Sequence, residues 1–355
     1  KIEGIDKVLI IGSGPIVIGQ ACEFDYSGTQ ACKALREQGY KIVLVNSNPA
    51  TIMTDPVMAD ATYIEPLNVK RLEEIIEKER PDALLPNLGG QTGLNLACEL
   101  NKAGVLDKYG VKVIGVNLEA IERGEDREIF KATMQKLGID TPRSGICHTV
   151  EEAEKIVSEI GFPVVVRPAY TMGGAGGGFC YNVEELRTIC SNGLELSMTH
   201  QCLIEESILG WEELEVEVVR DAKNQMIAIC FIENIDPVGV HTGDSFCAAP
   251  FLTISKDLEN RLKEQAFKIV ESIGVIGGTN VQFAHDPKSD RVVIIEINPR
   301  TSRSSALASK ATGFPIAFVS AKLAAGLTLD QIPYWRDGSL EKYTPSGDYV
   351  VLKFA

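Results

Sequence analysis

The chain has 355 residues, of which 45% are hydrophobic and 24% charged, so it is expected to form a globular protein of two or three domains. Its net charge of −14 argues against a nucleic-acid partner, which would need clustered Lys and Arg. No apolar run approaches membrane-spanning length and no secretory signal opens the chain, so neither a membrane nor export is expected.

The nine cysteines are irregularly spaced and contain no C-x-x-C pair. This pattern predicts reduced, mostly buried thiols in a cytoplasmic protein, and it argues against a disulfide frame or a zinc site. The chain begins at Lys1 without Met and stops in an apolar run, so we expect a piece of a longer polypeptide.

The first 115 residues alternate short apolar runs with amphipathic segments. Helices are expected from about Thr29 to Gly39, at residues 69–78, and between the last two strands of this region. Strands are expected at residues 7–11, 41–45, 83–85 and 111–114. This alternation predicts a doubly wound parallel sheet, and we assign residues 1–120 to a Rossmann-like domain.

A glycine turn follows the first expected strand. Gly12, Gly14 and Gly19 are spaced G-x-G-x-x-x-x-G, and Val17 stands where a dinucleotide fingerprint has its third glycine. We therefore expect this turn to be structural or to bind something other than NAD.

Residues 121–200 are assigned to a small α+β lobe. Helices are expected at residues 125–137 and 151–159, and strands at 162–167 and 179–181. Between the two strands, residues 171–178 contain five glycines, which let backbone N–H groups approach an anion closely. We interpret this loop as a flap over a triphosphate, and the alternative is a flexible surface linker.

Residues 201–355 are assigned to a larger lobe made mostly of strands. Strands are expected at residues 203–206, 214–219 and 226–233, and helices at 256–273, from about Ser304, and at 316–325. Glu213 and Glu215 alternate with apolar residues, and the simplest interpretation for both is an exposed sheet face.

A β-hairpin in this lobe carries the strongest functional signal. Residues 281–283 and 295–300 flank a turn at 286–290. Alternation places Glu296, Asn298 and Arg300 on one face, opposite Ile295 and Ile297, and pairing brings Gln282 close to Glu296. Oxygen ligands for a hard cation beside a guanidinium for an anion are what a phosphoryl-transfer site needs.

These features together resemble the ATP-grasp superfamily and, within it, the first synthetase half of the carbamoyl-phosphate synthase large subunit. The resemblance runs over essentially the whole chain, and its most specific strings are residues 14–28, 46–55, 167–174, 296–300 and 302–313. It implies a pre-ATP-grasp domain followed by a two-lobed ATP-grasp domain, so the expected fold class combines α/β and α+β.

The resemblance also implies roles for single residues. Gln282, Glu296 and Asn298 match divalent-metal ligands, while Arg300 and Arg303 would orient bicarbonate and its phosphorylated product. Glu206 and Ile208 match an adenine hinge, and Glu213 a ribose contact. The remaining nucleotide-binding positions are Arg127, Arg167, Gly173, Gly174, Gly239, Val240 and His241.

The activity implied is ATP-dependent phosphorylation of bicarbonate to carboxyphosphate, which ammonia converts to carbamate for pyrimidine and arginine biosynthesis. The cofactors implied are ATP with Mg²⁺ or Mn²⁺, and the family also suggests K⁺ near Glu213 or His241. A glutamine amidotransferase small subunit and a C-terminal synthetase half are the implied partners in an oligomeric enzyme. The alternatives are a biotin carboxylase-like ATP-grasp enzyme and a nucleotide-binding module that is inactive when excised.

Overall fold

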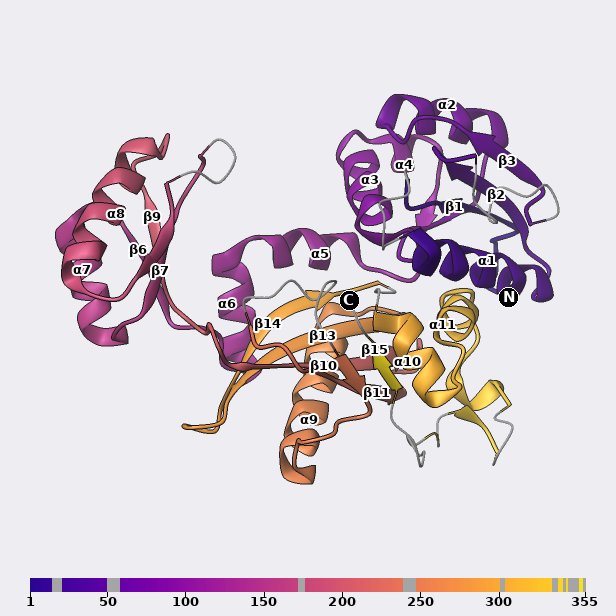
Figure 1. Cartoon of the computed structure of the whole chain (residues 1–355). Coiled ribbons are helices and arrows are strands. Elements are labelled where there is room, and N and C mark those ends of the chain that lie inside the picture. The colour runs from indigo at the N-terminus through magenta and orange to yellow at the C-terminus, as the bar shows by residue number, and fades with distance from the viewer. Residues whose placement is uncertain are drawn as a thin grey trace.

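The computed structural model describes residues 1–14, 21–49, 58–171, 176–238, 247–300, 304–333, 338–340, 343 and 351–353. Within these residues the chain forms three separate sheets, each with its own helices (Figure 1). We call them the N-terminal unit, the small lobe and the large lobe.

The N-terminal unit is built on a parallel five-stranded sheet in the order β3-β2-β1-β4-β5. Its strands are β1 Lys7–Ile11, β2 Lys41–Asn46, β3 Ala61–Ile64, β4 Ala83–Leu85 and β5 Lys112–Val113. Its helices are α1 Ala21–Glu37, α2 Val69–Glu79, α3 Gly90–Lys102 and α4 Val105–Lys108. Apolar clusters cover both faces of the sheet, as the continuous apolar strands predict, so the doubly wound expectation is confirmed.

Two details of this unit differ from the sequence-based expectation. The first helix begins at Ala21, not near Thr29, because polar residues before Thr29 do not interrupt the helix. Strand β3 was not expected, because its four residues form a partly exposed edge strand without a long apolar run.

Two helices follow the first sheet: one that was not expected, and then the one expected at residues 125–137. They are α5 Leu118–Glu125 and α6 Arg127–Lys136. Asp126 separates them in an extended conformation, and its side chain accepts hydrogen bonds from the backbone N–H groups of Glu128 and Ile129 at 2.9 and 3.1 Å. An N-cap of this kind starts a new helix, so Arg127 is the first residue of α6.

The small lobe contains a four-stranded antiparallel sheet in the order β6-β9-β7-β8. Its elements are β6 Ser144–Cys147, α7 Val150–Ile160, β7 Val164–Pro168, β8 Gly178–Cys180, α8 Val183–Leu196 and β9 Cys202–Glu206. Helices α7 and α8 cover one face, and the lobe stands apart from the rest of the chain in Figure 1. Strand β9 pairs with β6 and β7, whereas we had placed it in the lobe that begins at residue 201.

The large lobe contains an antiparallel six-stranded sheet in the order β14-β13-β10-β11-β12-β15. Its strands are β10 Glu212–Arg220, β11 Met226–Asn234, β12 Cys247–Ala249, β13 Gly277–Asp286, β14 Arg291–Asn298 and β15 Val351–Lys353. Its helices are α9 Lys256–Ile273, α10 Ser304–Thr312 and α11 Ile316–Ala324. Helix α9 covers one face, and Met134 of α6 packs into the same core, although residues 121–200 were assigned to the small lobe.

The hairpin β13–β14 has the expected position and pairs Gln282 with Glu296. Its side-chain alternation differs from the prediction, because a β-bulge between Gln282 and Phe283 leaves Ile295 without a register partner. Ile297 therefore packs with Ile294 against the α9 side, and it does not share a face with Ile295.

The N-terminal unit is docked onto the large lobe through α1 and α11 (Figure 1). The Tyr40 hydroxyl donates a 2.6 Å hydrogen bond to the carbonyl oxygen of Ala325, and Lys322 forms an ion pair with Glu37 at 3.1 Å. The side chains of eight of the nine cysteines are described; all eight are buried, as expected, and none of these eight is in a disulfide. Among the described residues, no helix is long and apolar enough to cross a membrane.

Candidate functional site

Opposite α9, the large-lobe sheet is polar over β10, β13 and β14, and we call this part the polar face; over β11 and β12 the same side packs in an apolar core with α10 and α11. Leu214, Val216 and Val218 pack into the core under α9, so the intervening acids point to the opposite face. These acids are Glu213, Glu215 and Glu217, and their exposed fractions are 5%, 1% and 2%. The expectation of an exposed sheet face for Glu213 and Glu215 was therefore wrong, because both side chains are buried and Glu215 is bonded by the buried amides of Asn234 and Asn280.

Strand pairing extends this polar face across β13 and β14. Gln282 lies opposite Glu215 on one side and Glu296 on the other. One step along the sheet, Asn280 lies opposite both Glu217 and Asn298.

Buried amides hold the two inner carboxylates in place. The amide nitrogen of Asn280 donates to Glu215 at 3.0 Å and to Glu217 at 2.9 Å, and that of Asn234 donates to Glu215 at 2.9 Å. Asn298 donates in turn to the amide oxygen of Asn280 at 3.3 Å. Hydrogen bonds to ionised groups are stronger than neutral ones, so this network fixes the polar face rigidly.

The environment at the outer end of this face disfavours the ionised form of Glu213. The pKa of Glu213 is raised to about 8, first by burial and then by the charges of Glu215 and Glu296. Glu296 itself is exposed. A cation at this end of the face would be attracted by these carboxyl groups.

The donor set fits a hard divalent cation. Gln282 and Glu296 are register partners, and the amide nitrogen of Asn298 is used by Asn280, which leaves its oxygen as a ligand atom. Carboxylate and amide oxygens are the ligands that Mg²⁺ prefers in proteins. Among the described residues, no group of three His, Cys, Asp or Glu could hold a metal, so this set depends on its amide oxygens.

Arg300 follows β14, and its side chain reaches the N-terminal unit. Its Nε donates to the amide oxygen of Gln91, at the start of α3, over 3.4 Å. The guanidinium that was predicted to bind an anion therefore lies between the end of β14 and the start of α3. Its expected companion Arg303 lies outside the described residues.

The two arginines predicted to bind phosphate come together on the small lobe. Arg127 begins α6 and Arg167 lies near the end of β7, yet both face the Glu205 carboxylate, at 3.9 and 3.6 Å. Their side chains are 60% and 50% exposed, so both remain available to a ligand. Sequence reasoning missed Glu205, whose only signal was its place beside the singled-out Glu206.

The glycine-rich segment that was interpreted as a flap lies between β7 and β8, and its last glycine, Gly178, begins β8. Strands β7 and β8 pair antiparallel, with Val166 opposite Gly178, so the glycine loop joins two adjacent strands. Several predicted nucleotide-binding residues lie outside the described residues: Gly173, Gly174, Gly239, Val240 and His241.

Glu206 ends β9, and Ile208 follows in the connection to β10, at the predicted hinge. The Glu206 carboxylate accepts hydrogen bonds from the guanidinium of Arg291 at 2.8 Å and from the backbone N–H of Arg143 at 3.0 Å. Its side chain is therefore occupied by protein groups. Sequence reasoning also missed Arg291, because it resembles an ordinary polar residue after a turn.

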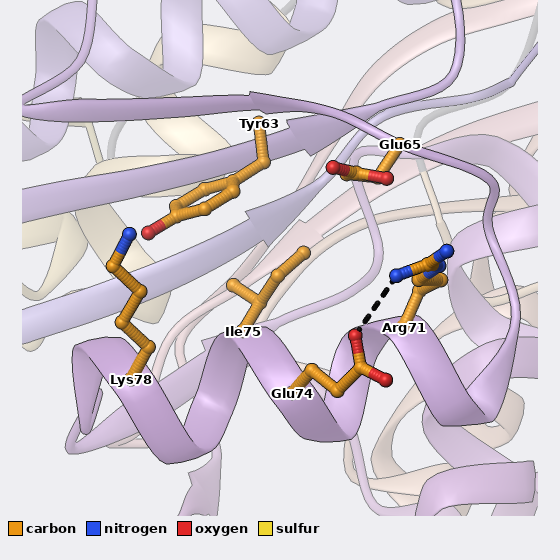
Figure 2. Close-up of a pocket in the computed structure, with 6 residues that line it drawn as sticks. All are labelled: Tyr63, Glu65, Arg71, Glu74, Ile75 and Lys78. Carbon is orange, nitrogen blue, oxygen red and sulfur yellow. Dashed lines mark hydrogen bonds and ion pairs between the residues drawn. The ribbon is translucent and has the colours of Figure 1, made fainter.

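A shallow hollow of about 160 Å³ lies elsewhere, between β3 and α2 (Figure 2). Arg71 and Glu74 form an ion pair at 3.0 Å along its rim. Its lining residues are Tyr63, Glu65, Arg71, Glu74, Ile75 and Lys78, and none of the predicted site residues is among them. We therefore assign it no part in the predicted chemistry.

Solved structures with a similar fold include biotin carboxylases. The biotin carboxylase–βγ-ATP complex from Campylobacter jejuni matches with a TM-score of 0.70 and 23% identity, over 92% of this chain and 72% of that one. The biotin carboxylase domain of Hydrogenobacter thermophilus 2-oxoglutarate carboxylase, solved with MgADP and bicarbonate, matches with a TM-score of 0.68 and 22% identity, over 95% and 72%. At this identity the likeness establishes the fold, which is that of an ATP-grasp protein.

Sequence comparison narrows the class. The family model described as the carbamoyl-phosphate synthase L chain, ATP binding domain, matches residues 126–332, and the carbamoyl phosphate synthase preATP-grasp domain matches residues 4–123. The chain therefore belongs to the carbamoyl-phosphate synthase large-chain family, as its sequence strings predict.

Its relatives show how much of that protein the chain represents. It is 60% identical to the carbamoyl phosphate synthase large chain of Archaeoglobus fulgidus, over 99% of this chain and 33% of that one. It is 58% identical to the large chain, N-terminal section, of Aquifex aeolicus, over 98% and 63%. The chain thus spans about a third of the length of a full large chain.

Proposed function

We propose that this chain phosphorylates bicarbonate with ATP and that ammonia converts the product to carbamate. The observation that carries the proposal is the row formed by Gln282 and Glu296, with Asn298 beside it, on the polar face of the large lobe. Membership of the carbamoyl-phosphate synthase family supports bicarbonate as the substrate that is phosphorylated beside this row. Identity of 60% to a synthase against 23% to a biotin carboxylase favours ammonia over biotin as the acceptor.

The chemistry requires positioning and charge stabilisation more than a strong nucleophile. A bicarbonate oxygen attacks the γ-phosphorus of ATP, the bond to the β-phosphate oxygen breaks, and carboxyphosphate and ADP form. The nitrogen lone pair of ammonia then attacks the carboxyl carbon, phosphate leaves with the carbon–oxygen bonding electrons, and the loss of a proton gives carbamate.

The residues of this chain would bind and orient these substrates. Arg127 and Arg167 would bind phosphate oxygens together with the flap glycines Gly173 and Gly174. The backbone near Glu206 and Ile208 would bind adenine and Glu213 the ribose, and Gly239, Val240 and His241 would complete the nucleotide site. Arg300 and Arg303 would hold bicarbonate and carboxyphosphate.

Gln282, Glu296 and Asn298 would hold Mg²⁺ or Mn²⁺, which when bound neutralises charge on the phosphates. The close grouping of the Glu213, Glu215 and Glu296 carboxyl groups also supports a K⁺ ion nearby, as the family suggests.

The whole enzyme would supply what this chain does not. A glutamine amidotransferase subunit would deliver ammonia, and a second synthetase half would phosphorylate the carbamate in an oligomer that serves pyrimidine and arginine biosynthesis. The pattern of buried cysteines without disulfides among the described residues supports the cytoplasm as its location.

The test is ADP release from MgATP with and without bicarbonate. We expect bicarbonate to stimulate release in the wild type, and Glu296→Ala to reduce the stimulated rate at least about 100-fold. Glu264→Ala is the matched control, because Glu264 is exposed on α9, on the other side of the sheet, and should leave the rate unchanged. Turnover that ignores bicarbonate, or that survives in Glu296→Ala, would refute the proposal.

A further inference from the structure

The chain passes between the two lobes twice, and the passages lie side by side. It enters the small lobe through residues 137–143, between α6 and β6, and leaves through residues 206–211, from the last residue of β9 to the residue before β10. The backbone N–H of Glu206 donates to the carbonyl of Arg143 at 2.8 Å, and the N–H of Arg143 donates to the Glu206 carboxylate at 3.0 Å. The two crossings are therefore bonded to each other.

Arg291 fastens both crossings to the large-lobe sheet. It is the first residue of β14, and each of its three guanidinium nitrogens has a partner on a crossing. Nε donates to Asp140 Oδ2 at 2.7 Å, Nη1 to Glu206 Oε2 at 2.8 Å, and Nη2 to the carbonyl oxygen of Thr141 at 3.3 Å. A rigid planar fork that binds three partners fixes their relative orientation, which a flexible ammonium cannot do.

Burial strengthens the ion pair between Arg291 and Glu206. The side chains of Arg291 and Glu206 are only 18% and 12% exposed, so water competes weakly for their ion pair. Asp140 is 54% exposed and contributes less. The guanidinium also lies 5.9 Å from the ring centroid of Trp211, the last residue before β10. Arg291 thus contacts the returning crossing at both of its ends.

We propose that Arg291 is a positioning residue that sets the backbone orientation of residues 206–208 and thereby the recognition of the adenine base. The inference rests on the proposed function, because it takes this segment as the adenine hinge. Backbone groups recognise a base edge only when they are held at the correct angle, and the Glu206 side chain is engaged in holding that angle. Arg291 therefore acts on the base without touching it.

The experiment measures base discrimination in the absence of turnover. Calorimetry would give the affinities of the non-hydrolysable Mg²⁺ complexes of adenylyl and guanylyl imidodiphosphate, and of magnesium tripolyphosphate, which has no base. We expect Arg291→Gln to lower the adenine-to-guanine preference about tenfold, the loss of about one well-placed hydrogen bond. Tripolyphosphate affinity should change less than about twofold, because Arg127 and Arg167 are untouched.

Arg261→Gln is the matched control. Arg261 lies on α9 and binds Asp290, the residue before Arg291, at 3.0 Å, so its loss removes the same charge beside the same turn without contacting a crossing. The adenine preference of this variant should equal that of the wild type. An equal loss in Arg261→Gln and Arg291→Gln would mean that the turn matters only for folding and would overturn the inference.

Glu206→Gln keeps the test decisive if Arg291→Gln does not fold. It weakens the same contact from the other side, and it should lower the preference in the same direction. If both variants fold, the double variant should lose no more than the larger single loss, because both changes break one contact. An adenine-to-guanine preference in Glu206→Gln equal to that of the wild type would overturn the inference. A wild type that binds tripolyphosphate as tightly as the adenine nucleotide would instead remove the hinge assignment, while bicarbonate-stimulated turnover tests the proposed reaction separately.

Discussion

The amide of Asn280 holds two buried carboxylates, and replacing it should weaken the large lobe severely. Asn280 is fully buried in β13, and its nitrogen donates to Glu215 at 3.0 Å and to Glu217 at 2.9 Å. Asn280→Leu keeps nearly the same shape but removes both donors. Each charge-assisted bond contributes about 1.5–3 kcal/mol, so the expected loss is about 3–6 kcal/mol. That is a large part of the roughly 5–15 kcal/mol that stabilises a domain.

The neighbouring Thr279 provides a matched control. It is also fully buried in β13, but its hydroxyl oxygen has no hydrogen-bond partner. Thr279→Val removes this unsatisfied group while keeping the shape, so we expect no loss and a gain of up to about 1 kcal/mol.

Native-state hydrogen exchange measures the difference in stability between Asn280→Leu and Thr279→Val within the large-lobe sheet itself. The chain has several cores, so the opening free energy of β10 and β13 is a better quantity than a single global value. A loss of 3–6 kcal/mol predicts exchange of β13 amides about 10²–10⁴ times faster in Asn280→Leu. Exchange as slow as in Thr279→Val would refute the argument that these amide–carboxylate bonds stabilise the sheet.

Two further substitutions and one chemical probe test other parts of the fold. Gly89→Ala should destabilise the N-terminal unit by about 3 kcal/mol, because the added Cβ would lie 2.2 Å from the carbonyl oxygen of Ile11. Gly124→Ala is the control: Gly124 has open space around it in α5, so this change should raise the melting temperature slightly. A lower melting temperature in Gly124→Ala, or an unchanged melting temperature in Gly89→Ala, would contradict this prediction. Burial raises the pKa values of Cys180 and Cys202 to about 11, so iodoacetamide at pH 8 should label them only after unfolding, as mass spectrometry would show. Because the folded state keeps protons that the unfolded thiols release, these residues should lower stability as pH rises from about 9 to about 11, and a rise in stability across this window would contradict the assigned burial.

The sequence predicted most of the elements because their apolar periods are strong. The α9 range was predicted to the residue, and the inward positions Leu72, Ile75 and Ile76 of α2 are buried as expected. What failed were short elements with little apolar periodicity. Helix α5 was not predicted because it buries only Leu118, and the edge strand β3 is too short to carry a pattern.

The site was predictable only where its residues are close in sequence. Pairing of Gln282 with Glu296 follows from the hairpin, and the structure agrees. The convergence of Arg127 and Arg167 on Glu205 depends on how three separate elements fold, which periodicity does not encode. Arg291 was missed for the same reason, since its partners lie 85 and about 150 positions away.

The bulge at Ile295 divides β14 into two halves, and the alternation of side chains between the two faces starts anew after it. Ile294 and Glu296 are two positions apart and would share a face in a regular strand, yet Ile294 packs in the core while Glu296 pairs beside Gln282 on the polar face. The extra residue therefore reverses the face to which the following side chains point, so that residues before it pack in the core and Glu296 after it lies on the polar face. Deleting it would turn either the core or the ligands to the wrong side, so the spacing between Ile294 and Glu296 is as strictly required as their identities.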